Sequence, residues 1–137
     1  MIHNKYLEDI GLRVEQITSN VCGDNDDRKS RWDKQKELYG FDERETWALQ
    51  TTFVEWLYSH LKMYLDIGGK VVDLDFYTFE YKGEQHTQRK CVEIILSACE
   101  KFLKAEDPFW DDDDDSIVQN MIDAIKLFAD IFPAMWW

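Results

Sequence analysis

The chain has 137 residues, of which 45% are hydrophobic and 15% aromatic, so it is long and apolar enough to bury a core, and we expect a single globular domain. No apolar run is long enough to cross a bilayer and no secretory signal precedes the first charged residues, which predicts a cytoplasmic protein without a membrane partner. The net charge of −12 argues against direct binding of nucleic acid and is compatible with docking onto a basic protein surface.

The first part of the chain predicts a helix, a loop and a second helix. Apolar side chains recur on one side of residues 4–19, which indicates a helix, although Gly11 weakens it by about 1 kcal/mol relative to alanine. Residues 20–30 are rich in Asn, Asp, Gly and Ser, which favours a loop. A short polar helix follows, with Ser30 as its predicted N-cap, and Gly40 ends it. Its strong apolar anchors are Trp32 and Leu38. Residues 1–38 are a candidate for a loosely packed extension of the domain.

The predicted centre of the fold is a helix from Phe41 to Asp66. Asp42 and Glu45 have the spacing of a capping box, and the pair Gly68-Gly69 supplies the end. Two apolar stripes run along this segment, the first with Trp47, Val54, Leu57, Leu61 and Leu65, and the second with Leu49, Phe53, Trp56 and Met63. A helix with two apolar stripes is covered from more than one side, so we expect both stripes to be buried.

The second half of the chain predicts a hairpin between helices. Residues 78–86 favour a small β-hairpin that turns at Lys82 and Gly83. Thr87 is the predicted N-cap of a helix over residues 88–104, which has a broad apolar face.

A last helix is expected after the Asp107-Pro108 break. Ser116 and Gln119 have the spacing of a second capping box, which would open a helix from Ile117 to about Phe132. Its predicted buried face consists of Met121, Ile122, Ile125, Phe128 and Ala129. The pattern as a whole predicts a mainly α domain of about four helices with a small inserted β-hairpin.

No arrangement typical of an enzyme is visible in the sequence. The histidines and cysteines lack metal-ligand spacing, and the glycines match no phosphate-binding loop. Ser59 and His60 are neighbours in sequence and therefore point apart on a helix. Cys91 and Cys99 fall in an apolar helical pattern, where we expect reduced, buried thiols. We therefore expect no catalytic residue, no metal and no cofactor.

One segment points to a protein partner. Phe109 and Trp110 precede an unbroken acidic run formed by Asp111, Asp112, Asp113, Asp114 and Asp115. Aromatic anchors beside clustered charge are a common way for an interface to combine affinity with electrostatic steering. The alternative is that both aromatics belong to the core and the aspartates only complement the dipole of the next helix.

Two indoles end the sequence. Trp136 and Trp137 either fold back onto the core or mark a surface for self-association.

The motif Gly-Phe-Asp-Glu-Arg-Glu-Thr-Trp-Ala-Leu at residues 40–49 carries a resemblance. Together with Glu-Trp-Leu-Tyr at 55–58, Leu-Lys-Met-Tyr at 61–64 and the ending Phe-Pro-Ala-Met-Trp-Trp at 132–137, it resembles a group of small, uncharacterised acidic proteins of tailed phages and prophages. The resemblance covers residues 39–137. It implies expression in the cytoplasm of a bacterial host, where small acidic phage proteins often act as inhibitors, including inhibitors of CRISPR nucleases, or as adaptors.

Two functional hypotheses follow. The first is a non-enzymatic phage-type protein that inhibits a host or antiphage-defence protein, for example a nucleic-acid-binding nuclease, through the acidic surface at residues 109–115. The alternative is a homo-oligomeric structural or assembly protein of phage origin that associates through Trp136 and Trp137.

Overall fold

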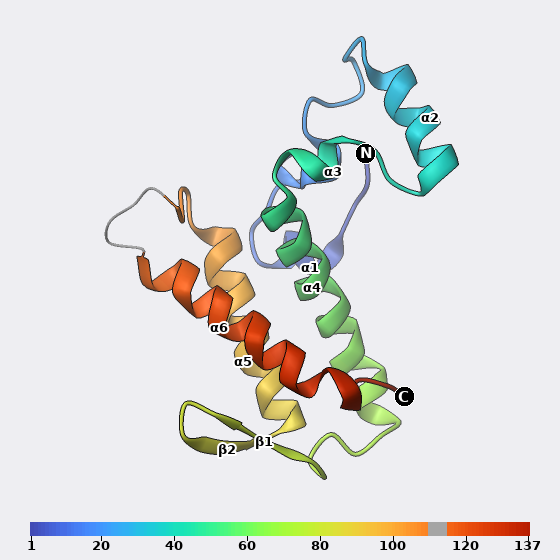
Figure 1. The fold of residues 1–137 in the computed structure, drawn as a ribbon. Helices are drawn as coiled ribbons and strands as arrows, with labels where there is room; N and C mark the ends of the chain where they lie inside the picture. Colours follow the sequence, from blue (N-terminus) through green and yellow to red (C-terminus); the bar gives the residue numbers. More distant parts are fainter. Residues whose placement is uncertain (110–114) are drawn as a thin grey trace. The chain divides into compact units, whose positions relative to one another are not determined.

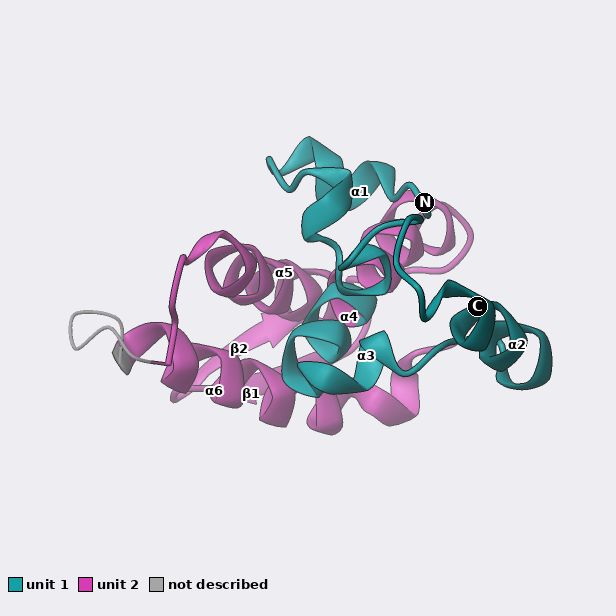
Figure 2. Ribbon diagram, turned by 90° about the horizontal axis from the view of Figure 1, so that it is seen from above, with its two compact units in different colours: residues 1–56 teal, residues 57–137 magenta. Residues whose placement is uncertain are grey.

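The computed structural model describes residues 1–109 and 115–137 and is mostly helical, with one two-stranded antiparallel sheet in these residues (Figure 1). This confirms the predicted mainly α fold with a small hairpin. The chain divides into two compact units, Met1–Trp56 and Leu57–Trp137, which Figure 2 distinguishes by colour. Each unit is described by itself below.

Unit 1 opens with a helix much shorter than the sequence predicts. The helix α1 spans Lys5–Asp9, and the side chain of Asn4 caps it by accepting a hydrogen bond from the N–H of Leu7. Gly11 then takes a left-handed conformation, with φ of 97°, which turns the chain out of the helix. Two 3-10 turns, η1 at Val14–Gln16 and η2 at Thr18–Asn20, replace the rest of the expected helix over residues 4–19, so that prediction is wrong beyond Asp9.

The helix α2 spans Lys29–Tyr39 and confirms the predicted short polar helix. Gly40 ends it in the left-handed conformation, with φ of 84°, as expected. Ser30 is not the N-cap, because the helix already begins at Lys29 and no side chain caps it. Trp32 is the one buried anchor, since Leu38 is 62% exposed.

The predicted central helix is divided into two. The helix α3 spans Arg44–Trp47 and α4 spans Leu49–Asp66, and Ala48 between them leaves helical geometry with φ of −130° and ψ of 69°. The two helices are therefore separate elements, and the prediction of one continuous helix from Phe41 is wrong.

Only one of the two apolar stripes of α4 is covered. Val54, Leu57 and Leu61 are almost fully buried, which confirms most of the first stripe, although Trp47 is 46% exposed. The second stripe is exposed along its whole length, so the expected burial of this stripe is wrong; its members are Leu49, Phe53, Trp56 and Met63.

The hairpin of unit 2 confirms its predicted position. After the turn η3 at Gly68–Lys70, strand β1 spans Thr78–Tyr81 and pairs with β2, which spans Glu84–Thr87. Lys82 and Gly83 both have positive φ, 51° and 82°, which is the geometry of the tight turn that fits the twist of a two-residue hairpin.

The helices α5 and α6 form the core of unit 2, where they run side by side in opposite directions (Figure 1). The helix α5 spans Gln88–Lys104, and Thr87 caps it by accepting a hydrogen bond of 3.2 Å from the N–H of Lys90, as predicted. The helix α6 spans Asp115–Ile131, followed by a 3-10 turn, η5, at Phe132–Ala134.

The buried face and the start of α6 both differ from the prediction. The buried side chains of this helix are Met121, Ala124, Leu127 and Ile131. Ile122 and Ile125 are exposed, because α5 covers a face rotated from the predicted one. Ser116 is not an N-cap, since the helix has already begun at Asp115, and the side chain of Gln119 donates to Asp123 instead of reaching back.

Candidate partner-binding site

Phe109 is the residue of the predicted partner site that the structure places most clearly. Its side chain is 48% exposed, and its ring meets that of Phe102 edge to face, with the ring centroids 5.7 Å apart. Phe102 belongs to the core face of α5 and is 4% exposed. Phe109 is therefore held on one side by the core while much of its ring surface remains accessible.

The acidic run lies largely outside the described residues. Trp110 and Asp111, Asp112, Asp113 and Asp114 belong to the part of the chain that the structure does not describe. Asp115 is the first residue of α6. The acidic run thus follows the exposed ring of Phe109 in the sequence, and its last residue is the first residue of α6.

The two tryptophans at the end of the sequence differ in their surroundings. The indole of Trp137 lies directly over Gly68, so that a β-carbon at position 68 would stand 2.6 Å from Nε1 of Trp137. Trp137 nevertheless keeps 57% of its surface exposed, and Trp136 is 72% exposed. Trp137 thus folds back over Gly68, whereas self-association through these residues stays a prediction.

Hydrogen bonds from the side chain of Gln88 hold the segment that precedes these tryptophans. The side-chain amide of Gln88 is 2% exposed and lies 3.1 Å from both the carbonyl oxygen of Ala134 and the hydroxyl of Tyr64. Gln88 is the first residue of α5, whereas Phe102 lies near its other end. These two positions are separated by about 21 Å of helix, so Phe109 and the tryptophan pair belong to separate surfaces of unit 2.

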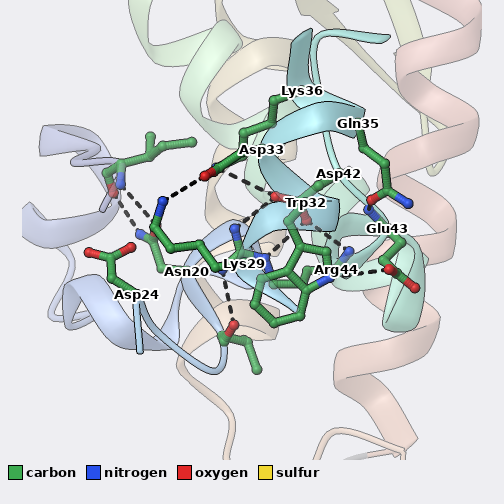
Figure 3. Close-up of polar contacts among 12 residues, drawn as sticks. Asn20, Asp24, Lys29, Trp32, Asp33, Gln35, Lys36, Asp42, Glu43 and Arg44 are labelled. Carbon is green, nitrogen blue, oxygen red and sulfur yellow. Dashed lines mark hydrogen bonds and ion pairs between the residues drawn. The ribbon is translucent and has the colours of Figure 1, made fainter. Parts of the chain in front are cut away.

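Unit 1 contains a buried ion pair that the sequence analysis missed (Figure 3). Asp42 is 1% exposed and accepts hydrogen bonds from the N–H, Nε and Nη2 of Arg44, at 2.9, 3.0 and 2.7 Å. The Arg44 guanidinium lies 4.3 Å from the ring centroid of Trp32 and donates to the carbonyl oxygen of Val21. The carboxylate of Asp42 therefore binds the N–H of the first residue of α3 and also neutralises the cation stacked on the indole.

The surroundings of the pair explain its ionisation. Burial alone would raise the pKa of Asp42, but the hydrogen bonds and charge of Arg44 outweigh it, and the pKa is lowered. The same hydrogen bond raises the pKa of Arg44. Lys36 adds a second positive charge 3.4 Å from Asp42. Both partners are thus charged at neutral pH. The close spacing of Asp42 and Arg44 in the sequence is the signal that could have indicated the pair.

The Trp32 indole is also fixed at its polar edge. Its Nε1–H donates to Glu43 at 3.2 Å, and Glu43 also accepts a hydrogen bond from Arg31. The side chain of Gln35 accepts the N–H of Glu43 at 2.9 Å. These contacts attach α2 to the segment before α3 and give the cluster a structural role in unit 1.

Unit 1 also presents apolar side chains that the sequence analysis placed in the core. Leu49, Phe53 and Trp56 are 60%, 36% and 49% exposed on α4. The rings of Phe53 and Trp56 are stacked, with centroids 6.5 Å apart. Aromatic side chains are more frequent at protein interfaces than on the rest of a protein surface.

The side chains that could bind a metal ion do not lie together in the described part of the chain. Residues 1–109 and 115–137 contain no cluster of three or more His, Cys, Asp or Glu side chains that could hold a metal ion.

None of the helices within these residues has the length and apolarity needed to cross a membrane. Cys91 and Cys99 are buried, as predicted, and burial raises the pKa of Cys99 to about 12.

Comparison with protein-family models, curated protein sequences and solved structures found no significant match to this chain.

Proposed function

We propose that this chain is a non-enzymatic phage-type interaction protein that inhibits a host or antiphage-defence protein. The partner has a basic surface, such as the nucleic-acid groove of a nuclease or CRISPR effector, and the acidic segment that follows Phe109 docks onto it. The proposal gives the chain a place in the cytoplasm of a bacterial host.

The observation that carries this proposal is the position of Phe109. Its ring is 48% exposed yet fixed edge to face against the buried Phe102. Five consecutive aspartates begin two residues later, at Asp111. An aromatic side chain held by a core helix loses little conformational entropy on binding, and adjacent carboxylates increase the rate of encounter with a basic surface.

The overall charge supports the same class of partner. A net charge of −12 repels nucleic acid and attracts the basic surfaces of the proteins that bind it. Docking of this acidic chain in the groove of its partner would block the groove by occupying it. Inhibition of this kind requires stoichiometric binding and no catalytic step.

The test is a pull-down of the tagged chain from a bacterial host lysate, washed at low and at high salt, and followed by affinity measurements on the captured protein. Replacing Asp111, Asp112, Asp113 and Asp114 by Asn should weaken binding and reduce its salt dependence. The matched control neutralises four exposed acids elsewhere, namely Asp27, Glu37, Glu84 and Asp130. Both variants change the net charge equally, so equal losses of affinity would contradict a local steering role.

A second candidate function is self-assembly, which the 72% exposure of Trp136 favours. A homo-oligomer formed through this surface would show a mass above the monomer by light scattering, and Trp136→Ala would restore the monomer. A chain that stays monomeric at high concentration would contradict this candidate.

A further inference from the structure

A surface hollow of about 250 Å³ lies on unit 2, between α5, the hairpin and α6. Its lining includes Ile94 and Ala98 of α5, Tyr81 of the hairpin and Asn120 of α6. A second hollow of about 500 Å³ continues toward the end of α5, and Ser97 and Lys101 line both.

The place where the two hollows meet carries hydrogen-bond donors on one helical face. Ser97, Lys101 and Lys104 are spaced by four and three residues on α5, so their side chains project from the same side. A serine hydroxyl and lysine ammonium groups are donors that suit the oxygens of a phosphate group.

The charges around this junction leave one ammonium group available. Glu100 pairs with Lys104 at 3.4 Å, and Glu93 pairs with Lys90 at 3.9 Å. Lys101 forms no ion pair with any residue in the described parts of the chain. Lys90, Lys101 and Lys104 line the two hollows together with Glu93 and Glu100, so the lining carries one net positive charge in a chain of net charge −12, which favours an anionic ligand over a cationic one.

We propose that this junction binds a small phosphate monoester with an apolar body. The phosphate contacts Lys101 and Ser97, with Lys104 beside them. The apolar body lies in the smaller hollow on Ile94 and Ala98 and extends toward the Tyr81 ring. The proposal does not rest on the function proposed above.

The test titrates the full chain with phenyl phosphate and follows the backbone amide signals of α5 by NMR. We expect saturable shifts at Ser97 and Lys101 at millimolar concentrations, and a dissociation constant that rises with salt. Lys101→Gln should weaken binding about tenfold, since it removes the charge and keeps the length of the side chain. Lys101→Arg should retain most of the affinity.

The matched control is Lys126→Gln, which removes the same charge from an exposed position of α6 that lines neither hollow. Phenol supplies the apolar body without the phosphate, and inorganic phosphate supplies the anion without the body. The proposal is overturned if phenol binds as tightly as phenyl phosphate, or if both lysine variants lose the same affinity. The absence of saturable shifts in α5 also overturns it. Thermal unfolding of Lys101→Gln should match that of the unmodified chain, because Lys101 is exposed.

Discussion

The indole of Trp137 covers Gly68, and the contact leaves no room for a β-carbon at that position. Gly68 has an ordinary backbone conformation, because its φ is not among the positive values in the chain. The requirement for glycine is therefore steric and comes from the tryptophan. The contact joins the last residue of the sequence to the turn that follows α4.

This contact predicts that Gly68→Ala lowers the free energy of unfolding by about 1–3 kcal/mol, because a methyl group would overpack the interface or displace the indole. Urea denaturation measures the loss, and tryptophan fluorescence reports the displaced ring. In the background of Trp137→Ala the same substitution should cost much less. If the two effects simply add, Gly68 and Trp137 are not coupled and the steric explanation fails.

The buried pair in unit 1 predicts a large effect from the loss of one partner. Asp42→Ala leaves the Arg44 guanidinium buried without its carboxylate and should lower the free energy of unfolding by about 3 kcal/mol. The control is Asp26→Ala, which breaks the more exposed pair with Arg28 and should lower the free energy of unfolding much less. Similar losses in both variants, measured by urea denaturation, would show that burial of the Asp42 pair is unimportant.

A buried carboxylate on α4 predicts a contribution to the free energy of unfolding that falls as pH rises. The contribution of Asp42 has the opposite sign, because its pKa is lowered. Glu55 is 6% exposed and accepts hydrogen bonds from the N–H and hydroxyl of Thr18. Burial raises its pKa above the ordinary value of 4.5, although the Thr18 hydrogen bonds act against the shift. The folded state therefore binds a proton more tightly than the unfolded state, and this group lowers stability as pH rises from 4.5 through the folded pKa.

The variant Glu55→Gln should remove that part of the pH dependence and keep an oxygen that accepts from Thr18. We expect the difference in unfolding free energy between mildly acidic and mildly alkaline pH to become smaller than in the unmodified chain. Glu55→Ala should instead lose about 1–3 kcal/mol, because Thr18 would lose its acceptor. An unchanged pH profile in Glu55→Gln would assign the dependence to another group.

Two of the predicted serine and threonine caps, Thr87 and Ser30, form a matched pair for a capping test. Thr87→Ala removes the acceptor of the Lys90 N–H at the start of α5 and should cost about 1 kcal/mol. Ser30→Ala should have almost no effect, because Ser30 lies within α2 and makes no capping bond. Thermal denaturation of both variants distinguishes these outcomes, and a larger loss in Ser30→Ala would contradict the assignment.

The parts of the fold that the sequence predicts well are those with local causes. The hairpin turn at Lys82 and Gly83 and the Thr87 cap depend on residues within a few positions of each other. The break at Ala48 has no such signal, since neither proline nor glycine lies next to it. The contacts of the surrounding chain determine it, and the sequence pattern alone continues the helix through it.

Which apolar face is buried depends on neighbours far along the chain. In α6, apolar residues occupy so many positions that both the predicted face with Ile122 and Ile125 and the observed face with Ala124 and Leu127 are compatible with helical spacing. Packing on α5 selects between them. In the candidate partner site, the acidic run is evident from composition, whereas the half-exposed position of Phe109 depends on its packing against Phe102, which a sequence pattern does not specify.

The three cysteines have a practical consequence for labelling. Cys91 and Cys99 are buried within α5, and burial raises the pKa of both thiols, so neither reaches an alkylating reagent as a thiolate in the folded chain. Cys22 is exposed in a turn of unit 1, with its sulfur 3.6 Å from Nη2 of Arg28. A maleimide dye should therefore attach at one position without any engineered substitution. The native chain thus provides a single position, on unit 1, for a fluorescent label.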